Sequence, residues 1–345
     1  MYILSSSKNK NRFQTIPVEH QLSSALYRGS ITLVLGAGIS MPRGIPNWES
    51  LAKQLWEKCF GKRNSPWKCK NGSTPRQISQ FLPMVFELVY NELGEDRFLN
   101  VLRKELYYNV KYPGDDPKFK KSYESLAVLA RLILQEYNRK FRRIDTIITF
   151  NADDFIEQAI YAVAGLKKSS PFTEIVRVIA RATHSQSNLK RGIPLYHIHG
   201  FLPSNHVIKY SKFDHMLVFT DAQYWSTSAS ALTFANRIMS SALSEGRCIF
   251  IGLSMTDINL LRWMALRNIE LNRDIQEIER NQKSGINPEF LHRIFQRHFW
   301  IRPASDDPNG FLTKFFNIRG INSVEIKDWT GNSFQKLIEK CFSQK

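Results

Sequence analysis

One stretch, residues 31–46, limits what this chain can fold into more than any other. It opens with Ile31–Leu35, an apolar and β-branched run that predicts a strand buried on both faces. Gly36-Ala37-Gly38-Ile39-Ser40 follows at once, and glycine allows unusual backbone angles and a close approach to the main chain. Where a buried strand turns this tightly, converging N–H groups suit an anion such as a pyrophosphate. Met41 stands where the dinucleotide fingerprint has its third glycine, so an ordinary glycine turn explains this stretch equally well.

The strand pattern recurs along the chain, with helical patterns between most of the strands. Beyond residues 31–35 we predict strands at residues 145–150, 195–199, 248–251, 298–301 and 323–326. Helical crossovers join parallel strands in the right-handed sense. The chain is therefore expected to be an α/β protein with a Rossmann-like, doubly wound parallel sheet of six strands.

Helical spacing without strands fills the segment from residue 61 to residue 143. It begins with a basic, turn-rich loop, and its apolar stripes then predict two or three helices. We expect one domain over residues 1–345, with a Rossmann-like core at about 20–60 and 144–345. Residues 61–143 form its helical insertion over the ligand cleft in this prediction, and residues 1–16 form a loose polar arm.

Composition narrows the class of protein. An apolar share of 43% is that of a globular protein, and no apolar run approaches the ~20 residues of a membrane helix. The first thirty residues lack the apolar core of a signal peptide. The four cysteines, Cys59, Cys69, Cys248 and Cys341, are scattered without a disulfide framework. We therefore expect a cytoplasmic protein with no membrane partner.

The formal net charge of +17 attracts polyanions. The basic residues are nevertheless spread over several short clusters, each of which is equally consistent with a solvated surface. The total charge keeps a nucleic acid or an acidic protein among the expected partners.

Polar and glycine residues follow the predicted strands at the points where those strands end. In an open α/β sheet, ligands bind outside the carboxyl ends of the strands. The candidates are Gly36 to Ser40 after the first strand, Asn151 and Asp153 after the second, His199 and Gly200 after the third, and Gly252 and Ser254 after the fourth.

Asn151 and Asp153 each allow two interpretations. An amide at a strand end can hold a ribose hydroxyl or a water near a reacting carbon, but Asn151 could equally cap a helix that begins at Asp153. Asp153 could contact a ribose or serve as a first-turn acid at the helix N-terminus.

Two histidines lie two residues apart at the end of the third predicted strand. A neutral imidazole at His199 can take a proton from a ribose hydroxyl or a water. His197 is expected on the same side of the strand, where a His-x-His pair can hold a metal. No second ligand cluster accompanies the pair, so we expect His197 to be a hydrogen-bonded core histidine.

Short motifs along the chain occur in the order of the sirtuin pattern. They are Gly36-Ala37-Gly38-Ile39-Ser40, Gly44-Ile45-Pro46, Thr149-Phe150-Asn151-Ala152-Asp153, His199-Gly200 and Gly252-Leu253-Ser254. Over roughly residues 20–340 the sequence resembles the Sir2 superfamily. Thr220-Asp221-Ala222-Gln223-Tyr224, and Asp257 shortly after Ser254, look more like its bacterial SIR2-like branch of NAD-consuming antiphage defence proteins.

The sequence departs from the deacylases of that superfamily at two places. Those enzymes carry a zinc module of paired Cys-x-x-Cys motifs, whereas Cys59 and Cys69 are the only near pair here, so we expect no zinc. They also continue Gly-Ile-Pro with Asp-Phe-Arg, whereas this chain has Asn47-Trp48-Glu49. Trp48 either shields the reactive ribose carbon, as the family phenylalanine does, or is simply buried.

The resemblance implies an NAD+ hydrolase that breaks the nicotinamide–ribose bond and gives nicotinamide and ADP-ribose. Asn151 and His199 would be its catalytic residues. The implied contacts with NAD come from Gly36, Ala37, Gly38 and Ser40 at the pyrophosphate, Trp48 and Asp153 near the ribose, and Gly252, Ser254 and Asp257 at the adenosine half.

Rival functions come from other classes of protein. The alternatives are an NAD-dependent protein deacylase, a nucleic-acid-binding or nuclease subunit of a defence complex, and a non-catalytic sensor of NAD or ADP-ribose. Members of the resembling branch often act as homo-oligomers beside a partner such as a helicase-like ATPase or a short Argonaute, and the resemblance implies partners of this kind.

Overall fold

The computed structural model describes residues 18–27, 31–67, 81–166, 175–181, 192–206, 217–281, 298–329 and 331–342. The predicted polar arm at residues 1–16 and the side chain of Cys69 lie outside these ranges.

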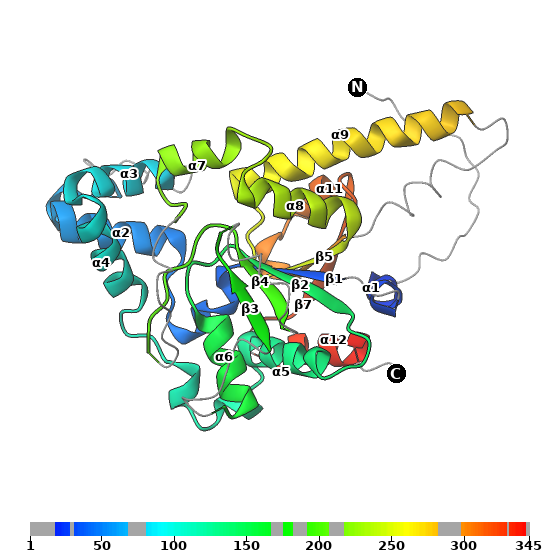
Figure 1. Ribbon diagram of the computed structural model, residues 1–345, viewed down its shortest axis with the longest axis horizontal. Coiled ribbons are helices and arrows are strands. Elements are labelled where there is room, and N and C mark those ends of the chain that lie inside the picture. Colours follow the sequence, from blue (N-terminus) through cyan, green and yellow to red (C-terminus); the bar gives the residue numbers. More distant parts are fainter. Residues whose placement is uncertain are drawn as a thin grey trace.

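The described strands form one parallel sheet, in the order β3-β4-β2-β1-β5-β6-β7. Its strands are β1 (Ile31–Leu35), β2 (Ile144–Thr149), β3 (Val176–Ile179), β4 (Ile193–His197), β5 (Arg247–Ile251), β6 (His298–Pro303) and β7 (Ile321–Ile326). The predicted Rossmann-like α/β class is confirmed, and Figure 1 shows the sheet at the centre of the molecule.

One strand was absent from the sequence prediction. β3 has only four residues, and Arg177 interrupts its apolar character. It lies at the edge of the sheet and pairs only with β4, so its register depends on that neighbour. A short strand of this kind carries too little of a periodic pattern to be recognised alone.

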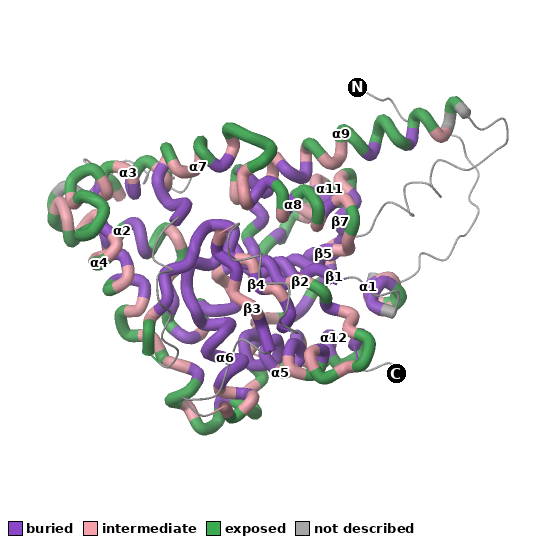
Figure 2. Tube along the Cα trace, viewed as in Figure 1, coloured by how far each residue is buried: buried purple, intermediate pink, exposed green. Residues whose placement is uncertain are grey.

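Helices cover both faces of the sheet, because alternate strand residues point to opposite sides. Leu33, Ile147 and Ile249 face one core, and Val34 and Ile148 face the other. The helices with the first core are α1 (Val18–Tyr27), α2 (Trp48–Phe60), α3 (Leu82–Leu93), α4 (Glu95–Leu106), α5 (Ser125–Tyr137), α6 (Phe155–Ala164) and α12 (Ser333–Phe342). Those with the second core are α8 (Phe234–Glu245), α9 (Ile258–Asn281) and α11 (Phe311–Asn317). Figure 2 shows the strands as the buried centre between them.

The predicted insertion at residues 61–143 contains helices of two kinds. Helices α3 and α4 pack against α2 at one end of the molecule, whereas α5 packs against α6 and α12 beneath the sheet (Figure 1). Helix α7 (Asp221–Ser228) packs against α3. The division of the chain into a core and an insertion stays a prediction.

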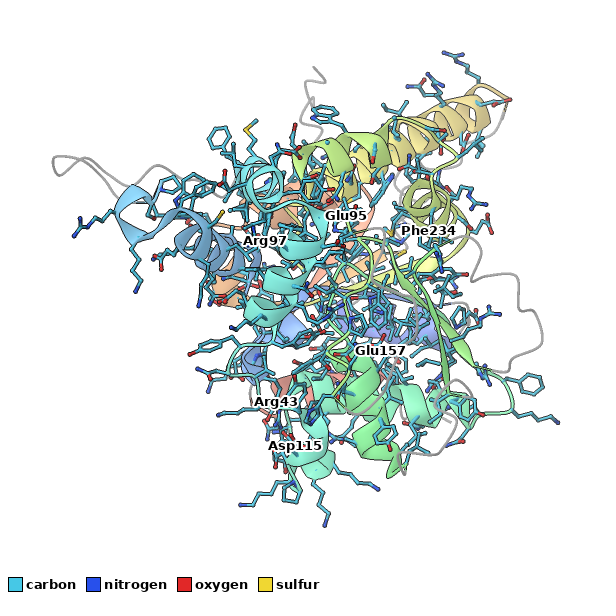
Figure 3. All side chains as sticks on the ribbon, turned by 60° about the vertical axis from the view of Figure 1, so that its left-hand side comes forward. Arg43, Glu95, Arg97, Asp115, Glu157 and Phe234 are labelled. Carbon is cyan, nitrogen blue, oxygen red and sulfur yellow. The ribbon has the colours of Figure 1, made fainter. Side chains whose placement is uncertain are left out.

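Arg43 joins the β1 loop to the segment before α5. Its side chain is 4% exposed, and its guanidinium binds Glu124 at 2.7 Å and Asp116 at 2.9 Å. It also lies over the ring of Phe119. Figure 3 shows Arg43 beside Asp115, the neighbour of Asp116. A buried arginine requires such paired partners, so this contact fixes the end of the glycine loop.

Strand β1 is the centre of the sheet, with β2 on one side and β5 on the other. The order in which successive strands are added to the sheet therefore reverses at β1, and the loops after β1 and β5 meet there. The Gly36 N–H donates to the carbonyl of Ile251 at 3.0 Å, and the Gly38 N–H donates to the carbonyl of Gly252 at 2.9 Å. The backbones of the two loops lie in direct contact, which is why glycine is required.

We predict that Gly38→Ala destabilises the fold by roughly 1–3 kcal/mol, because the new Cβ would lie 2.9 Å from both Cα and O of Gly252. Gly165→Ala is the control: no described atom lies within 4 Å, so its cost of about 1 kcal/mol comes from the left-handed backbone alone. Urea unfolding measures both variants. An equal or smaller loss for Gly38→Ala would contradict the close packing of the two loops.

Candidate functional site

The predicted site residues come together around the carboxyl ends of β1, β2, β4 and β5. Asn151 and Asp153 follow β2, and His199 lies in the turn after β4. Gly36 to Ser40 follow β1. The chain forms two short 3₁₀ turns here, η1 (Ala37–Ile39) within this loop and η2 (Met41–Arg43) directly after it.

Asn151 is tied to the glycine loop. Its Nδ2 donates to the carbonyl of Gly36 at 3.2 Å and to Oγ of Ser40 at 3.4 Å. Helix α6 begins at Phe155 and its N-cap is Asp154, so the Asn151 side chain is not a helix cap. Among the described residues nothing donates to Oδ1 of Asn151, which leaves an acceptor for a ligand or a water.

Asp153 is buried beside this amide. Its Oδ1 accepts from Ser40 Oγ at 3.2 Å and from the Phe155 N–H at 3.0 Å. Burial raises the pKa of Asp153 to about 7, although the Phe155 hydrogen bond opposes this. The pKa of the neighbouring Asp154 is raised to about 6 by burial and next by the charge of Glu157. These two carboxyl groups therefore take up protons in the native state near neutral pH.

His197 belongs to the core. Its Nδ1 lies 2.9 Å from the carbonyl of Asn151, which can only accept, so Nδ1 carries a hydrogen. Its Nε2 lies 2.7 Å from Glu157, and neither side chain has any exposed surface. His197 therefore makes two hydrogen bonds inside the core. Figure 3 labels Glu157, which comes from helix α6.

The prediction that His197 and His199 lie on the same side of one strand is wrong. β4 ends at His197, so His199 lies in the following turn, where the alternation of strand side chains no longer applies. His197 binds Glu157, whereas His199 enters an aromatic group above the sheet edge.

His199 is buried without a hydrogen-bond partner. It is 1% exposed, and neither ring nitrogen has a partner among the described residues. Its ring lies 4.9 Å from Phe150, 5.5 Å from Tyr224 and 6.3 Å from Trp48, between ring centroids. Burial lowers the pKa of His199, and the charge of Asp257 partly opposes this. A neutral imidazole in this setting can accept a proton or a hydrogen bond from a bound molecule.

Trp48 lies edge-on to this histidine. Trp48 is the first residue of α2, where Asn47 caps the helix by accepting from the Ser50 N–H. Its ring stacks on Phe219 at 4.7 Å. Sequence reasoning did not single out Phe219, because a buried aromatic residue in a loop has no pattern that separates it from the core.

Gly252, Ser254 and Asp257 lie after β5, but they differ in their surroundings. Ser254 is exposed, and its hydroxyl lies 2.7 Å from that of Thr256. Gly252 has φ +68° and contacts the β1 loop, as described above. Asp257 accepts from the Leu260 N–H at 2.9 Å at the start of α9. Of the predicted pyrophosphate loop, the Ala37 N–H alone has no acceptor among the described residues.

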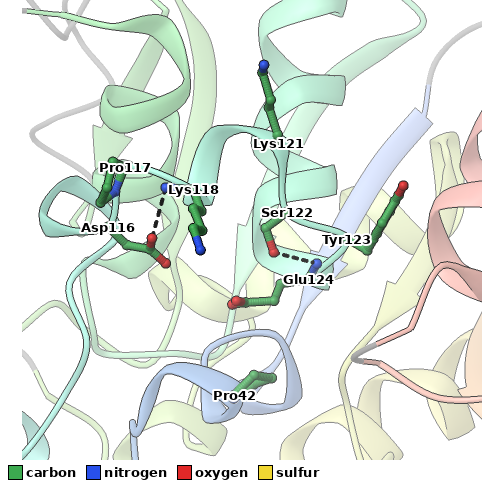
Figure 4. Close-up of a pocket in the computed structure, with 8 residues that line it drawn as sticks. All are labelled: Pro42, Asp116, Pro117, Lys118, Lys121, Ser122, Tyr123 and Glu124. Carbon is green, nitrogen blue, oxygen red and sulfur yellow. Dashed lines mark hydrogen bonds between the residues drawn. The ribbon is translucent and has the colours of Figure 1, made fainter.

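A hollow of about 840 Å³ lies elsewhere on the surface, near Pro42 (Figure 4). Its other lining residues are Asp116, Pro117, Lys118, Lys121, Ser122, Tyr123 and Glu124. It contains no predicted site residue. Within the described ranges, no group of three or more His, Cys, Asp or Glu side chains is placed to hold a metal ion, and no helix is both long and apolar enough to cross a bilayer.

The doubly wound sheet and the polar groups at its switch point define a class of α/β proteins that bind nucleotides at this edge. The family model of the SIR2-like domain matches residues 145–285, from β2 to just past α9. Over this part the chain is similar to the SIR2-like domains of the Sir2 superfamily, which bind NAD. The match includes Asn151 and His199 but not the glycine loop. No match was found among curated proteins.

We predict that Asp153→Asn stabilises the protein increasingly as the pH rises from 5 to 7. Between the usual pKa and about 7, the unfolded state loses the Asp153 proton while the native state keeps it, so wild-type stability falls by about 1.4 kcal/mol per pH unit from this group. Asparagine keeps the acceptor for Ser40 and Phe155 and carries no charge.

Thermal unfolding at pH 5, 6, 7 and 8 measures this difference between variant and wild type. The same substitution at the exposed Asp96 is the control and should leave the pH dependence unchanged. A constant difference across the pH range would contradict the raised pKa of Asp153.

Proposed function

We propose that the protein is an NAD+ hydrolase that cleaves the nicotinamide–ribose bond to give nicotinamide and ADP-ribose. The observation that carries this proposal is His199, a buried imidazole whose nitrogens make no hydrogen bond among the described residues, after β4 and within the segment that matches the SIR2-like domain. Natural structures rarely leave such a group unsatisfied without a functional reason.

The residues present suit a dinucleotide. Asn151 has a free acceptor oxygen, and the Ala37 N–H is a free donor in the glycine loop. The N–H groups of Gly36 and Gly38 donate to Ile251 and Gly252 at the end of β5, and those of Ile39 and Ser40 donate to carbonyls within the loop. Gly36 and Gly38 would therefore serve a pyrophosphate through the shape of the loop and not through their own N–H groups. Trp48 and Phe219 supply aromatic surface for a ribose or a nicotinamide ring.

The nicotinamide ring of NAD+ is already cationic, so it leaves without an acid. Catalysis then requires that the ribose be held, that positive charge on it be stabilised, and that a water be delivered. In the proposed mechanism Oδ1 of Asn151 orients the ribose or the water, and His199 accepts the proton that the water loses. Because His199 is 1% exposed, the substrate must displace part of its aromatic cover.

We predict that His199→Ala lowers NAD+ cleavage at least about a hundredfold, because it removes the general base. The substitution also leaves a cavity among Phe150, Tyr224 and Trp48 and lowers the melting temperature, so cleavage is compared per folded molecule. Nicotinamide and ADP-ribose are quantified by chromatography, with the purified chain and in cells that express it.

His206→Ala is the matched control, since this histidine stacks on Tyr112 outside the site and should leave cleavage unchanged. Cleavage that survives in His199→Ala would exclude the base. The absence of any NAD+ loss with the wild-type chain, in both settings, would overturn the proposed function.

We predict that Asn151→Ala lowers kcat by about a hundredfold or more and leaves NAD+ affinity within a few-fold. The amide acts on the reacting ribose, whereas other groups hold the rest of the dinucleotide. Loss of the hydrogen bond to the buried carbonyl of Gly36 should also cost roughly 1–3 kcal/mol of stability.

Turnover, affinity and unfolding are measured on the same preparation. Asn322→Ala, at a buried asparagine in the remote edge strand β7, controls for the loss of an internal amide. A fall in stability with turnover per folded molecule preserved would make Asn151 a structural residue only.

The cellular role that we propose is depletion of NAD in the cytoplasm as a defence against phage. A homo-oligomer and a partner protein, such as a helicase-like ATPase or a short Argonaute, are part of this proposal and rest on the sequence resemblance. The net charge of +17 supports nucleic acid as a further partner.

A further inference from the structure

We propose that Asp257 and Tyr224 are positioning residues for His199, and that Asp257 does not contact the adenosine half of NAD. Their effect on turnover rests on the proposed function. Their effect on the histidine itself does not, and it can be measured without any substrate.

One carboxylate oxygen of Asp257 binds the start of α9, and the other lies toward His199. Its Oδ1 accepts from the Leu260 N–H at 2.9 Å and so caps the N-terminus of α9. Its Oδ2 accepts from the Tyr224 hydroxyl at 3.1 Å and lies 3.9 Å from Nε2 of His199. The carboxylate side chain is 17% exposed. An anion held this rigidly beside a buried imidazole acts on its charge and on its orientation.

Tyr224 holds the second oxygen in place. It lies on α7, which begins with a reciprocal capping box between Thr220 and Gln223. Its ring lies 5.5 Å from the His199 ring and 6.2 Å from Trp48, and its hydroxyl donates to Asp257. Burial and the neighbouring carboxylate raise the pKa of Tyr224, so its hydroxyl stays a donor throughout the physiological range.

In this arrangement the two ring nitrogens of His199 have different roles. With a hydrogen on Nε2, directed at Asp257, the ring presents Nδ1 as the acceptor. When Nδ1 takes a proton from water, the imidazolium faces the carboxylate across a short distance. The other neighbours of the ring, Phe150 and Trp48, carry no charge, and Tyr224 is neutral. Burial lowers the pKa of Arg262 on α9, and the charge of the Asp257 carboxylate partly opposes this.

The kinetic test compares Asp257→Asn and Tyr224→Phe with the wild type. Asparagine retains an acceptor for the helix cap but loses the charge, and phenylalanine retains the ring but loses the donor. We expect kcat to fall about ten- to a hundredfold for Asp257→Asn and about three- to tenfold for Tyr224→Phe, with KM for NAD+ within about twofold. The acid limb of the pH profile should move to lower pH in Asp257→Asn, because the carboxylate no longer favours the imidazolium.

Each variant has a matched control. Asp307→Asn changes a carboxylate that likewise caps a helix, through the N–H groups of Leu312 and Thr313 on α11, far from His199. Tyr90→Phe removes a hydroxyl from helix α3. Both controls should keep the wild-type pH profile. A rise in KM with unchanged kcat in Asp257→Asn would overturn the proposal and favour an adenosine contact.

A second measurement is independent of turnover. The titration of His199 is followed by nitrogen-15 NMR of the histidine side chains, with the resonance assigned by its loss in His199→Gln. We expect His199 to titrate at lower pH in Asp257→Asn than in the wild type and in Asp307→Asn. An unchanged titration would overturn the proposed pair even if NAD+ is cleaved, and a shifted titration would support it even if NAD+ is not the substrate.

Discussion

The backbone contact between the loops after β1 and β5 is the constraint on which the rest of the site depends. The Gly38 N–H meets the carbonyl of Gly252, and a side chain at either position would overlap the opposite loop. This contact sets the position of the Gly36 carbonyl, which in turn holds Asn151. Ser40, at the end of the same loop, then reaches Asp153. The glycines thus serve the packing of the protein first, and any role toward a ligand follows from the shape that this packing creates.

A group of buried ionisable side chains surrounds this framework. Asp153, Asp154 and Glu157 lie within a few residues of one another, with His197 as the partner of Glu157. Burial disfavours the charged forms of Asp153 and Asp154, and both carboxyl groups accept hydrogen bonds from nearby elements. The protons that these two aspartates bind near neutral pH are a cost in stability that a purely structural core would avoid. Perturbed groups of this kind concentrate at functional sites.

His199 stands apart from that group because neither ring nitrogen makes a hydrogen bond within the described residues, although the Asp257 carboxylate lies 3.9 Å from Nε2. His197 is buried with hydrogen bonds at both ring nitrogens, whereas His199 is buried with none among the described residues. Two histidines that are nearly adjacent in the sequence thereby receive different roles from a single event, the end of β4 at His197. The aromatic cover of Trp48, Phe150 and Tyr224 removes water from His199, which strengthens any interaction that it makes with a bound substrate.

The sequence by itself determined the parallel α/β class, since runs such as residues 31–35 and 248–251 are short and apolar, as in strands buried on both faces, and helical patterns separate most of them. It also determined which strand ends carry polar groups, because that depends only on position along the chain. Only the tertiary structure decided what those groups do: that Asn151 binds Gly36 and is not a helix cap, that His197 and His199 separate, and that Tyr224 meets Asp257. The strand β3 likewise depends on its neighbour β4. The physical reason is that periodicity is a local property. The hydrogen bonds of Tyr224 to Asp257 and of Asn151 to Gly36 join residues 33 and 115 positions apart, so they exist only after folding has brought those segments together.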